Sequence, residues 1–402
     1  MGNVDMNLIL WQQKYINGFD SVAIDISGFC NAKCKYCPAG DDLSCKGEFI
    51  HPETYKMILE RLISNKLLTP MSKLHIYCLG EPLLHPNIDE ILRITKEFGL
   101  KTSLSTNASV VPNISDEASE AVDRILISMP GFSQSSYDKI HGFNFEKIKE
   151  NIFRIRKIFD KKPFDMSYHI YQFNMNEMED ARNFCKENFI RFSPNYAVLM
   201  DKNKCKSYIE NTMPYEELKD ISKELFLGVL DYQISVAPRN YCDFQERFLS
   251  VTINGDIRIC SSFTKDFEEN ILCGNILIDD VNEIIKRKYT FSYCEECKRN
   301  GLTLTEGSDC KVWPDSYYSL MKENEILYEG VKCKSTDIVL DELQVMKCIR
   351  KWEERNYDDV FMLDVKSKLQ SACLLKEQIK EIIFKYTRFP KKTWEVINEE
   401  IL

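Results

Sequence analysis

The chain has 402 residues, enough for one large domain of roughly 200 to 250 residues together with smaller ones. Its hydrophobic content of 44%, with 11% aromatic residues, is typical of a protein that folds around a packed core. A formal net charge of −9 provides no basic field for a nucleic acid or an anionic membrane, so we expect neither as a partner.

The use of cysteine indicates a reducing compartment. Sixteen cysteines could form disulfides, but the chain shows no signal peptide and is too long for a disulfide-stapled mini-domain. No stretch approaches the roughly 18 apolar residues of a membrane-spanning helix. We therefore expect a cytoplasmic protein whose thiolates bind metal.

Strands and helices alternate over the first half of the chain. Short apolar runs predict strands, and apolar side chains spaced three and four apart predict helices. Pro52 suits the start of the first helix, and Gly99 suits the end of the second. The expected strands are 22–26, 73–79, 100–105, 125–128, 164–172 and 190–199, and the expected helices are 52–63, 88–95, 115–122, 145–159 and 176–189.

Six such repeats over about 200 residues imply a parallel sheet with helices outside it. Eight repeats are needed to close a barrel, so the predicted α/β fold is an open, partial (β/α)6 barrel of TIM-like type. In parallel sheets of this kind, functional residues gather at the carboxyl ends of the strands. The candidate residues below all follow a predicted strand.

Three cysteines come directly after the first strand. Cys30, Cys34 and Cys37 are separated by three and then two residues, and the aromatic Tyr36 precedes the last one. Thiolates are soft ligands that suit iron–sulfur clusters. A [4Fe–4S] cluster held by three cysteines keeps one iron open to a small molecule. A structural zinc site is the alternative, although its usual signature is paired Cys-x-x-Cys units.

This spacing resembles the defining motif of the radical S-adenosylmethionine (SAM) enzymes. The resemblance implies that the open iron binds the amino and carboxylate groups of SAM, with Tyr36 beside the cofactor. It implies that one electron, from a donor of flavodoxin or ferredoxin type, cleaves SAM to a 5′-deoxyadenosyl radical. The family has a six-unit barrel, which matches the predicted fold. The protein then supplies placement and electrostatics, while the cofactors carry the chemistry.

A second motif follows the second strand. Gly80, Glu81 and Pro82 resemble the GGE-type motif of the same family, with Leu79 where a glycine is usual. The resemblance implies that a carboxylate and nearby backbone hold the amino group of SAM. Glycine permits a close approach of the backbone.

Short polar side chains follow the third and fourth strands. Ser105, Asn107 and Ser128 resemble the family's positions for hydrogen bonds to the ribose and carboxylate of SAM. An ordinary turn or capping role is the alternative for each of them. His75, on the second strand, is expected to be a core histidine.

A β-hairpin is predicted in the second half of the chain. Residues 248–253 and 256–260 read as strands, and Asn254 with Gly255 favours the two-residue turn that joins such strands. Cys242 and Cys260 flank this hairpin, and a Cys-x-x-Cys pair follows at Cys294 and Cys297. Four thiolates in this arrangement suit zinc as well as an iron–sulfur cluster.

The same four cysteines resemble the SPASM or "twitch" extensions of radical SAM enzymes, which hold auxiliary [4Fe–4S] clusters. A full SPASM domain would continue with cysteines at positions that are Thr303 and Gly307 in this chain. We therefore expect one auxiliary cluster, held by Cys242, Cys260, Cys294 and Cys297. Other cysteines could complete a second site or replace a ligand: Cys310 above all, and also Cys273 and Cys333.

The last part of the chain is expected to be helical. Apolar side chains at 372, 375, 379, 382 and 386 form a seam that could pack on the core or on a second subunit. The predicted domains are an extension over 1–20, the barrel over 21–225, the auxiliary-cluster domain (a hairpin plus a helix) over 226–315, and a helical tail over 316–402. A winged-helix module that would bind a leader peptide is not expected.

The favoured function is that of a radical SAM oxidoreductase that abstracts a hydrogen from a small molecule of sugar or aminocyclitol type and oxidises it with the auxiliary cluster. A radical SAM maturase acting on a peptide or protein, by crosslinking, epimerisation or side-chain oxidation, is the first alternative. A non-catalytic zinc protein is the second. The residues name neither the substrate nor a catalytic side chain.

Overall fold

The computed structural model describes residues 18–37, 48–199, 202–210, 212–227, 240–260, 272–303 and 390–400, and isolated residues between 230 and 384. The chain divides into two compact units. The first contains residues 1–212 and 234–314, and the second contains residues 213–233 and 315–402.

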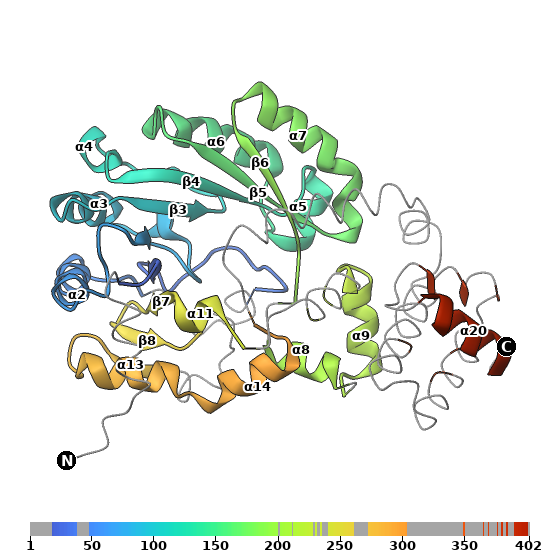
Figure 1. The fold of residues 1–402 in the computed structure, drawn as a ribbon. Helices are drawn as coiled ribbons and strands as arrows, with labels where there is room; N and C mark the ends of the chain where they lie inside the picture. Colours follow the sequence, from blue (N-terminus) through green and yellow to red (C-terminus); the bar gives the residue numbers. More distant parts are fainter. Residues whose placement is uncertain are drawn as a thin grey trace, which may run out of the picture. The chain divides into compact units, whose positions relative to one another are not determined.

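Among the described residues, the first unit is organised around one sheet of nine strands in the order β6-β5-β4-β3-β2-β1-β7-β8-β9 (Figure 1). Neighbouring strands from β6 to β7 pair in parallel, whereas β8 and β9 are antiparallel to their neighbours. The strands are β1 (Ser21–Ile24), β2 (Lys73–His75), β3 (Thr102–Thr106), β4 (Val122–Met129), β5 (Phe164–Ile170), β6 (Arg191–Tyr196), β7 (Phe248–Val251), β8 (Asp256–Arg258) and β9 (Leu272–Asn275).

Helices connect the parallel strands and make β1 to β6 the predicted partial (β/α)6 barrel. Pro52 opens α2, and Gly99, with φ of +67°, follows the end of α3, as the sequence indicated. The helices of this region are α2 (Pro52–Ser64), α3 (Ile88–Glu97), α4 (Asp116–Ser119), α5 (Gln134–Ile140), α6 (Phe145–Ile158) and α7 (Met178–Glu187), with 3-10 turns η1 (Pro82–Leu84) and η2 (Gln172–Glu177).

The register gives the barrel sheet two different faces. Alternate residues such as Val22, Leu74 and Ile125 are apolar and buried, on the face that the helices cover. The opposite face, which we call the inner face, carries polar side chains in laterally paired rows. These include His75, Ser103 and Arg124 in one row, Asp165 and Arg191 in a second, and Ser128, Ser167 and Ser193 in a third.

Several elements differ from the sequence-based expectation. The second strand ends at His75 instead of residue 79, and the helix expected over 176–189 is divided between η2 and α7. Helix α5 was not expected. Its seven residues are too few for a clear apolar stripe, and it begins where the Ser133 side chain accepts a hydrogen bond from Ser136 N.

The sequence predicted only part of the hairpin formed by β7 and β8. The two strands are antiparallel as expected, but the prediction of a two-residue Asn-Gly turn is wrong. Gly255 N donates to Thr252 O at 3.0 Å, so Ile253 and Asn254 occupy the centre of the turn. Gly255 follows with φ of +85°, the left-handed conformation that closes a longer connection with a bulge.

Strand β7 also pairs in parallel with β1, from Ser21 opposite Phe248 to Ile24 opposite Val251. The hairpin therefore continues the barrel sheet. Among the described residues, the helices that follow the barrel strands in the first unit are α8 (Lys202–Ile209), α11 (Asp243–Glu246), α13 (Val281–Tyr289) and α14 (Ser292–Asn300).

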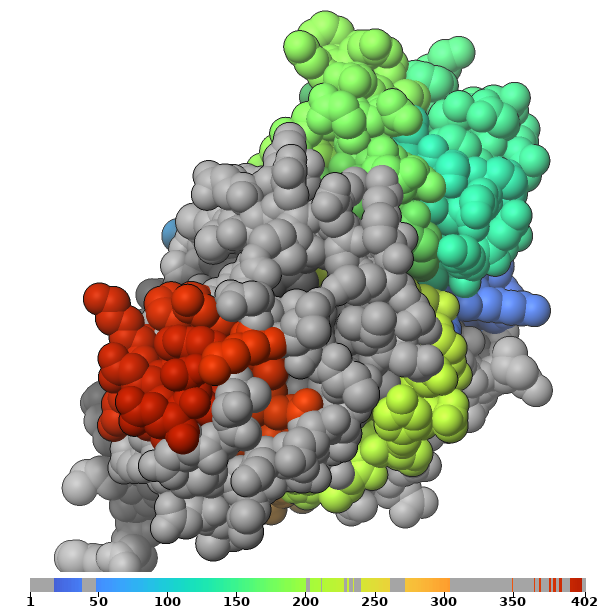
Figure 2. All heavy atoms as spheres, turned by 90° about the vertical axis from the view of Figure 1, so that its right-hand side faces the viewer, coloured from blue at the N-terminus to red at the C-terminus, as the bar shows by residue number. Residues whose placement is uncertain are grey.

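The described part of the second unit contains α9 (Tyr215–Ser222) and α20 (Pro390–Glu400), the latter shown in red in Figure 2. Of the predicted apolar seam, Ile379 is described and buried, whereas positions 372, 375, 382 and 386 lie outside the described residues, as do Cys310 and Cys333. None of the helices searched in the described residues is both long and apolar enough to cross a membrane.

Candidate functional site

The three cysteines of the first motif lie together just beyond the carboxyl end of β1. Cys37 N donates to Cys34 O at 3.1 Å, which folds the loop into a turn. Burial and then the neighbouring Cys37 and Cys30 thiolates raise the pKa of Cys34. Burial likewise raises the pKa of Cys30, to about 11. Mutual repulsion of this kind is relieved when a cation binds, so the loop suits a metal cluster.

The turn that begins at Gly80 packs directly against the cysteine loop. A Cβ atom on Gly80 would overlap the carbonyl oxygen of Ser27 and lie 3.2 Å from Phe29 O. Glu81 N donates to the same Phe29 O at 2.9 Å. Only glycine permits this approach, and it brings the second motif to the residue before Cys30.

The Glu81 carboxylate is 3% exposed and joins the turn to the end of β3. Oε1 accepts hydrogen bonds from Thr106 Oγ1 at 2.7 Å and Leu83 N at 3.0 Å, and Oε2 accepts one from Asn107 N at 2.7 Å. Burial raises the pKa of Glu81 to about 7, against the opposing effect of these donors. Pro82 is buried at the start of η1.

Asn107 connects β3 to the cysteine loop. Its Nδ2 donates to Asn31 Oδ1 at 3.0 Å and lies 3.8 Å from Cys30 Sγ. Asn31 Nδ2 donates in turn to Ser109 Oγ at 2.9 Å. Asn107, a predicted SAM contact, thus also contacts Cys30, a predicted cluster ligand, and the sequence did not single out Asn31 or Ser109.

The other predicted SAM contacts lie around the same edge. Ser105 and Ser128 are half-buried on the inner face of β3 and β4. The Tyr36 ring lies 6.2 Å from the ring of Tyr171, which follows β5, so the cysteine loop reaches across the carboxyl edge of the sheet. Asn174, in η2 after β5, is fully buried and hydrogen bonds to the backbone at Pro130, His169 and Tyr171.

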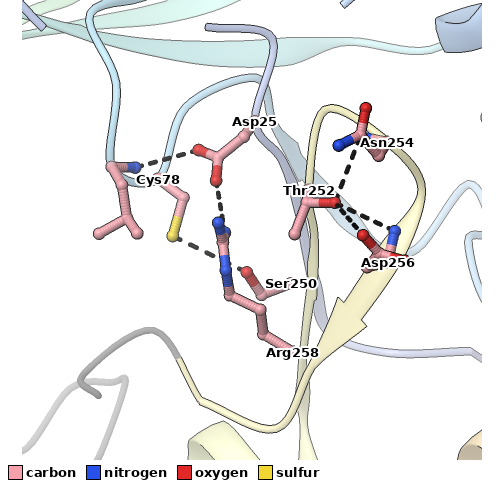
Figure 3. Close-up of polar contacts among 8 residues, drawn as sticks. Asp25, Cys78, Ser250, Thr252, Asn254, Asp256 and Arg258 are labelled. Atoms are coloured by element: carbon pink, nitrogen blue, oxygen red, sulfur yellow. Dashed lines mark hydrogen bonds and ion pairs between the residues drawn. The ribbon is translucent and has the colours of Figure 1, made fainter. Parts of the chain in front are cut away.

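An ion pair joins the barrel to the hairpin beside this site (Figure 3). Asp25 follows β1 and is 3% exposed. Its Oδ2 accepts from Arg258 Nη1 at 2.6 Å, and its Oδ1 accepts from Leu79 N at 3.0 Å. Cys78 Sγ lies 3.8 Å from Ser250 Oγ in the same cluster. Arg258 is two residues before Cys260, so this pair connects the two cysteine groups.

The four cysteines of the second group come together from three segments. Cys242 precedes α11, Cys260 follows β8, and Cys294 and Cys297 lie on α14. Burial, together with the thiolates of Cys260, Cys242 and Cys297, raises the pKa of Cys294 to about 12, against the opposing charge of Lys288. Cys273, expected to be spare, is buried on β9.

Both sets of thiols fit a cluster of several irons. Among the described side chains, no group of three or more histidine, cysteine, aspartate or glutamate residues is close enough to hold a single metal ion. Within each set the thiols are half-buried and close enough to raise one another's pKa. Soft, half-buried thiols of this kind are suitable ligands of an iron–sulfur cluster.

Comparison with known proteins identifies the barrel. A family model described as the radical SAM superfamily matches residues 24–185, which span both motifs. Residues 24–185 form a radical SAM domain. A curated relative, the probable GTP 3′,8-cyclase of Pyrococcus horikoshii, is 30% identical over 142 residues, which cover 35% of this chain and 44% of that protein.

A second relative, the AdoMet-dependent heme synthase of Methanosarcina barkeri, is 27% identical over 171 residues, or 41% of this chain and 47% of that protein. The chain therefore spans about half the length of these curated relatives. Among solved structures, SuiB of Streptococcus suis bound to the precursor peptide SuiA is 16% identical, with a TM-score of 0.49 and coverage of 76% of this chain and 72% of that one.

The radical SAM domain contains every residue predicted for the first cluster and for SAM. Sequence reasoning missed the residues that hold them in place, namely Asp25, Asn31 and Ser109. Asp25 alone gave a signal, since a carboxylate directly after an apolar strand is unusual in a buried position.

Proposed function

We propose that this chain is a radical SAM enzyme that cleaves SAM reductively at a [4Fe–4S] cluster and carries one auxiliary cluster. Cys30, Cys34 and Cys37 hold the first cluster, which supplies the electron and the open iron when SAM is bound. The observation that carries the proposal is the packing of the Gly80 turn on this loop, because it brings the backbone of residues 80 and 81 against Ser27 and Phe29, next to Cys30.

The proposed roles of the protein residues follow from their positions. The polar backbone of residues 80–82 receives the SAM amino group, and the Glu81 carboxylate keeps that turn against β3. Ser105 and Ser128 are available on the inner face for the ribose and carboxylate. Tyr36 covers the cofactor from the cysteine loop.

The proposed substrate is a small polar molecule of sugar or aminocyclitol type. The inner face supports this choice, since Ser128, Ser167 and Ser193 form a lateral row of hydroxyls on it. Hydroxyls bind substrates that carry many hydrogen-bonding groups. Cys242, Cys260, Cys294 and Cys297 would hold the auxiliary cluster, which accepts an electron as the substrate is oxidised.

Anaerobic reconstitution with iron and sulfide, followed by dithionite and SAM, tests the proposal. We expect 5′-deoxyadenosine and roughly eight irons per chain, as two cubane clusters require. Cys30→Ala should abolish cleavage, whereas Cys294→Ala should spare cleavage but impair substrate turnover. Zinc at the first triplet and no 5′-deoxyadenosine would favour the non-catalytic protein.

The substrate class is tested separately with deuterated compounds. Deuterium transfer into 5′-deoxyadenosine from a polyol or amino sugar would support the proposal. Transfer from precursor peptides alone would replace it with a peptide maturase.

A further inference from the structure

A lysine is buried among the cysteines of the second group. Lys288, near the end of α13, is 0% exposed, which is rare for a lysine side chain. Its Nζ donates to Phe244 O at 2.8 Å and to Ile259 O at 3.3 Å. These carbonyls lie close in sequence to Cys242 and Cys260, so the ammonium ties together two of the segments that carry the thiols.

The groups of opposite charge that act on Lys288 are cysteine thiolates. Burial lowers the pKa of Lys288, and the thiolates of four cysteines oppose that effect: Cys273, Cys294, Cys260 and Cys242. Within the described residues no carboxylate forms an ion pair with Lys288. A buried ammonium without a counter-charge is costly, even when carbonyls accept its hydrogen bonds. Three of these four cysteines, Cys242, Cys260 and Cys294, are proposed ligands of the auxiliary cluster, so their thiolates would compensate the ammonium.

A four-thiolate cluster would carry the matching charge. Four thiolates around an oxidised [4Fe–4S] core give a net charge of about −2, and reduction adds one more negative charge. A nearby buried cation stabilises the reduced state more than the oxidised state, because little water screens the interaction. The reduction potential of the cluster rises as a result.

We propose that the Lys288 ammonium is the counter-charge of the auxiliary cluster and raises its reduction potential. This inference rests on the auxiliary cluster of the proposed function. It assigns an electrostatic role to Lys288, because an uncharged donor could make the same two hydrogen bonds. The prediction is that removing the charge, while keeping a hydrogen-bond donor, makes the cluster harder to reduce.

The experiment isolates the auxiliary cluster in full-length protein that carries Cys30→Ala, Cys34→Ala and Cys37→Ala. Dithionite titration followed by electron paramagnetic resonance compares Lys288 with Lys288→Gln, which keeps a donor and loses the charge. Lys286→Gln is the matched control, since Lys286 lies on the same helix and is exposed. We expect a lower midpoint potential for Lys288→Gln and an unchanged one for Lys286→Gln.

An unchanged midpoint in Lys288→Gln with the cluster intact would overturn the inference. If Lys288→Gln binds no iron, the iron content of Lys288→Arg distinguishes a counter-charge role from a packing role. Iron retained by Lys288→Arg supports the counter-charge, and iron lost from both variants shows a packing role instead. If the background protein with Lys288 binds zinc or no iron, it is the auxiliary cluster of the proposed function that fails.

Discussion

Asp25 and Arg258 are 233 positions apart in the sequence, yet their side chains form an ion pair with 2.6 Å between Oδ2 and Nη1. Both are largely withdrawn from water, with side-chain exposures of 4% and 14%. Asp25 also holds the backbone of Leu79, one residue before the Gly80 turn. One carboxylate thus fixes the hairpin and the candidate SAM-binding turn to the end of β1.

Arg258→Met should lower the free energy of unfolding by about 3 kcal/mol, because it strands a buried carboxylate. Denaturant unfolding monitored by circular dichroism measures the change. The control is Lys147→Met, whose ion pair with Glu150 is exposed on both sides and should cost less than about 1 kcal/mol. Equal losses in the two variants would contradict a special role for the buried pair.

Gly80→Ala should reduce the iron bound by the first cysteine loop. The added methyl group overlaps Ser27 O, so either the turn or the loop has to move. Iron and sulfide analysis after anaerobic reconstitution measures the loss. Gly99→Ala is the control: it has no heavy atom within 4 Å of the added carbon and should cost only about 1 kcal/mol of stability through its positive φ. Normal iron binding by Gly80→Ala would show that the close approach is dispensable.

Asn107→Asp should weaken retention of the first cluster. The change replaces an N–H donor near Cys30 Sγ with a negative oxygen that repels both the thiolate and Asn31 Oδ1. Loss of a supporting contact to a metal ligand typically weakens metal binding about 10- to 100-fold. The rate of iron loss to a chelator gives the readout, and Asn113→Asp, at an exposed site, is the control. Identical rates of iron loss for the two variants would show that the Asn107 side chain does not support Cys30.

Glu81 should make the stability of the protein depend on pH. Its folded pKa of about 7 lies above the ordinary value of 4.5, so the folded state binds this proton more tightly than the unfolded state. The contribution of the protonated carboxyl is complete below about pH 4.5 and is lost as pH rises through about 7.

Glu81→Gln removes this titration. The difference in unfolding free energy between the unchanged chain and Glu81→Gln should decrease as pH rises from 4.5 to 7, by at most about 1.4 kcal/mol per unit. Denaturant unfolding at half-unit pH steps measures it. A difference that increases over this range would mean that the three donors outweigh burial and keep the carboxylate ionised.

The sequence by itself determined the local features of this protein. Apolar spacing marked most barrel strands and helices, and the spacing of Cys30, Cys34 and Cys37 predicted a metal-binding loop, because such a loop depends on spacing over a few residues. Tertiary structure decided the rest. The pairing of β7 with β1, the Asp25–Arg258 ion pair and the burial of Lys288 among distant cysteines join segments with no local signal for each other. Such contacts form only when the whole sheet is assembled. Tertiary packing therefore stabilises them, and no short stretch of the chain contains the information for them.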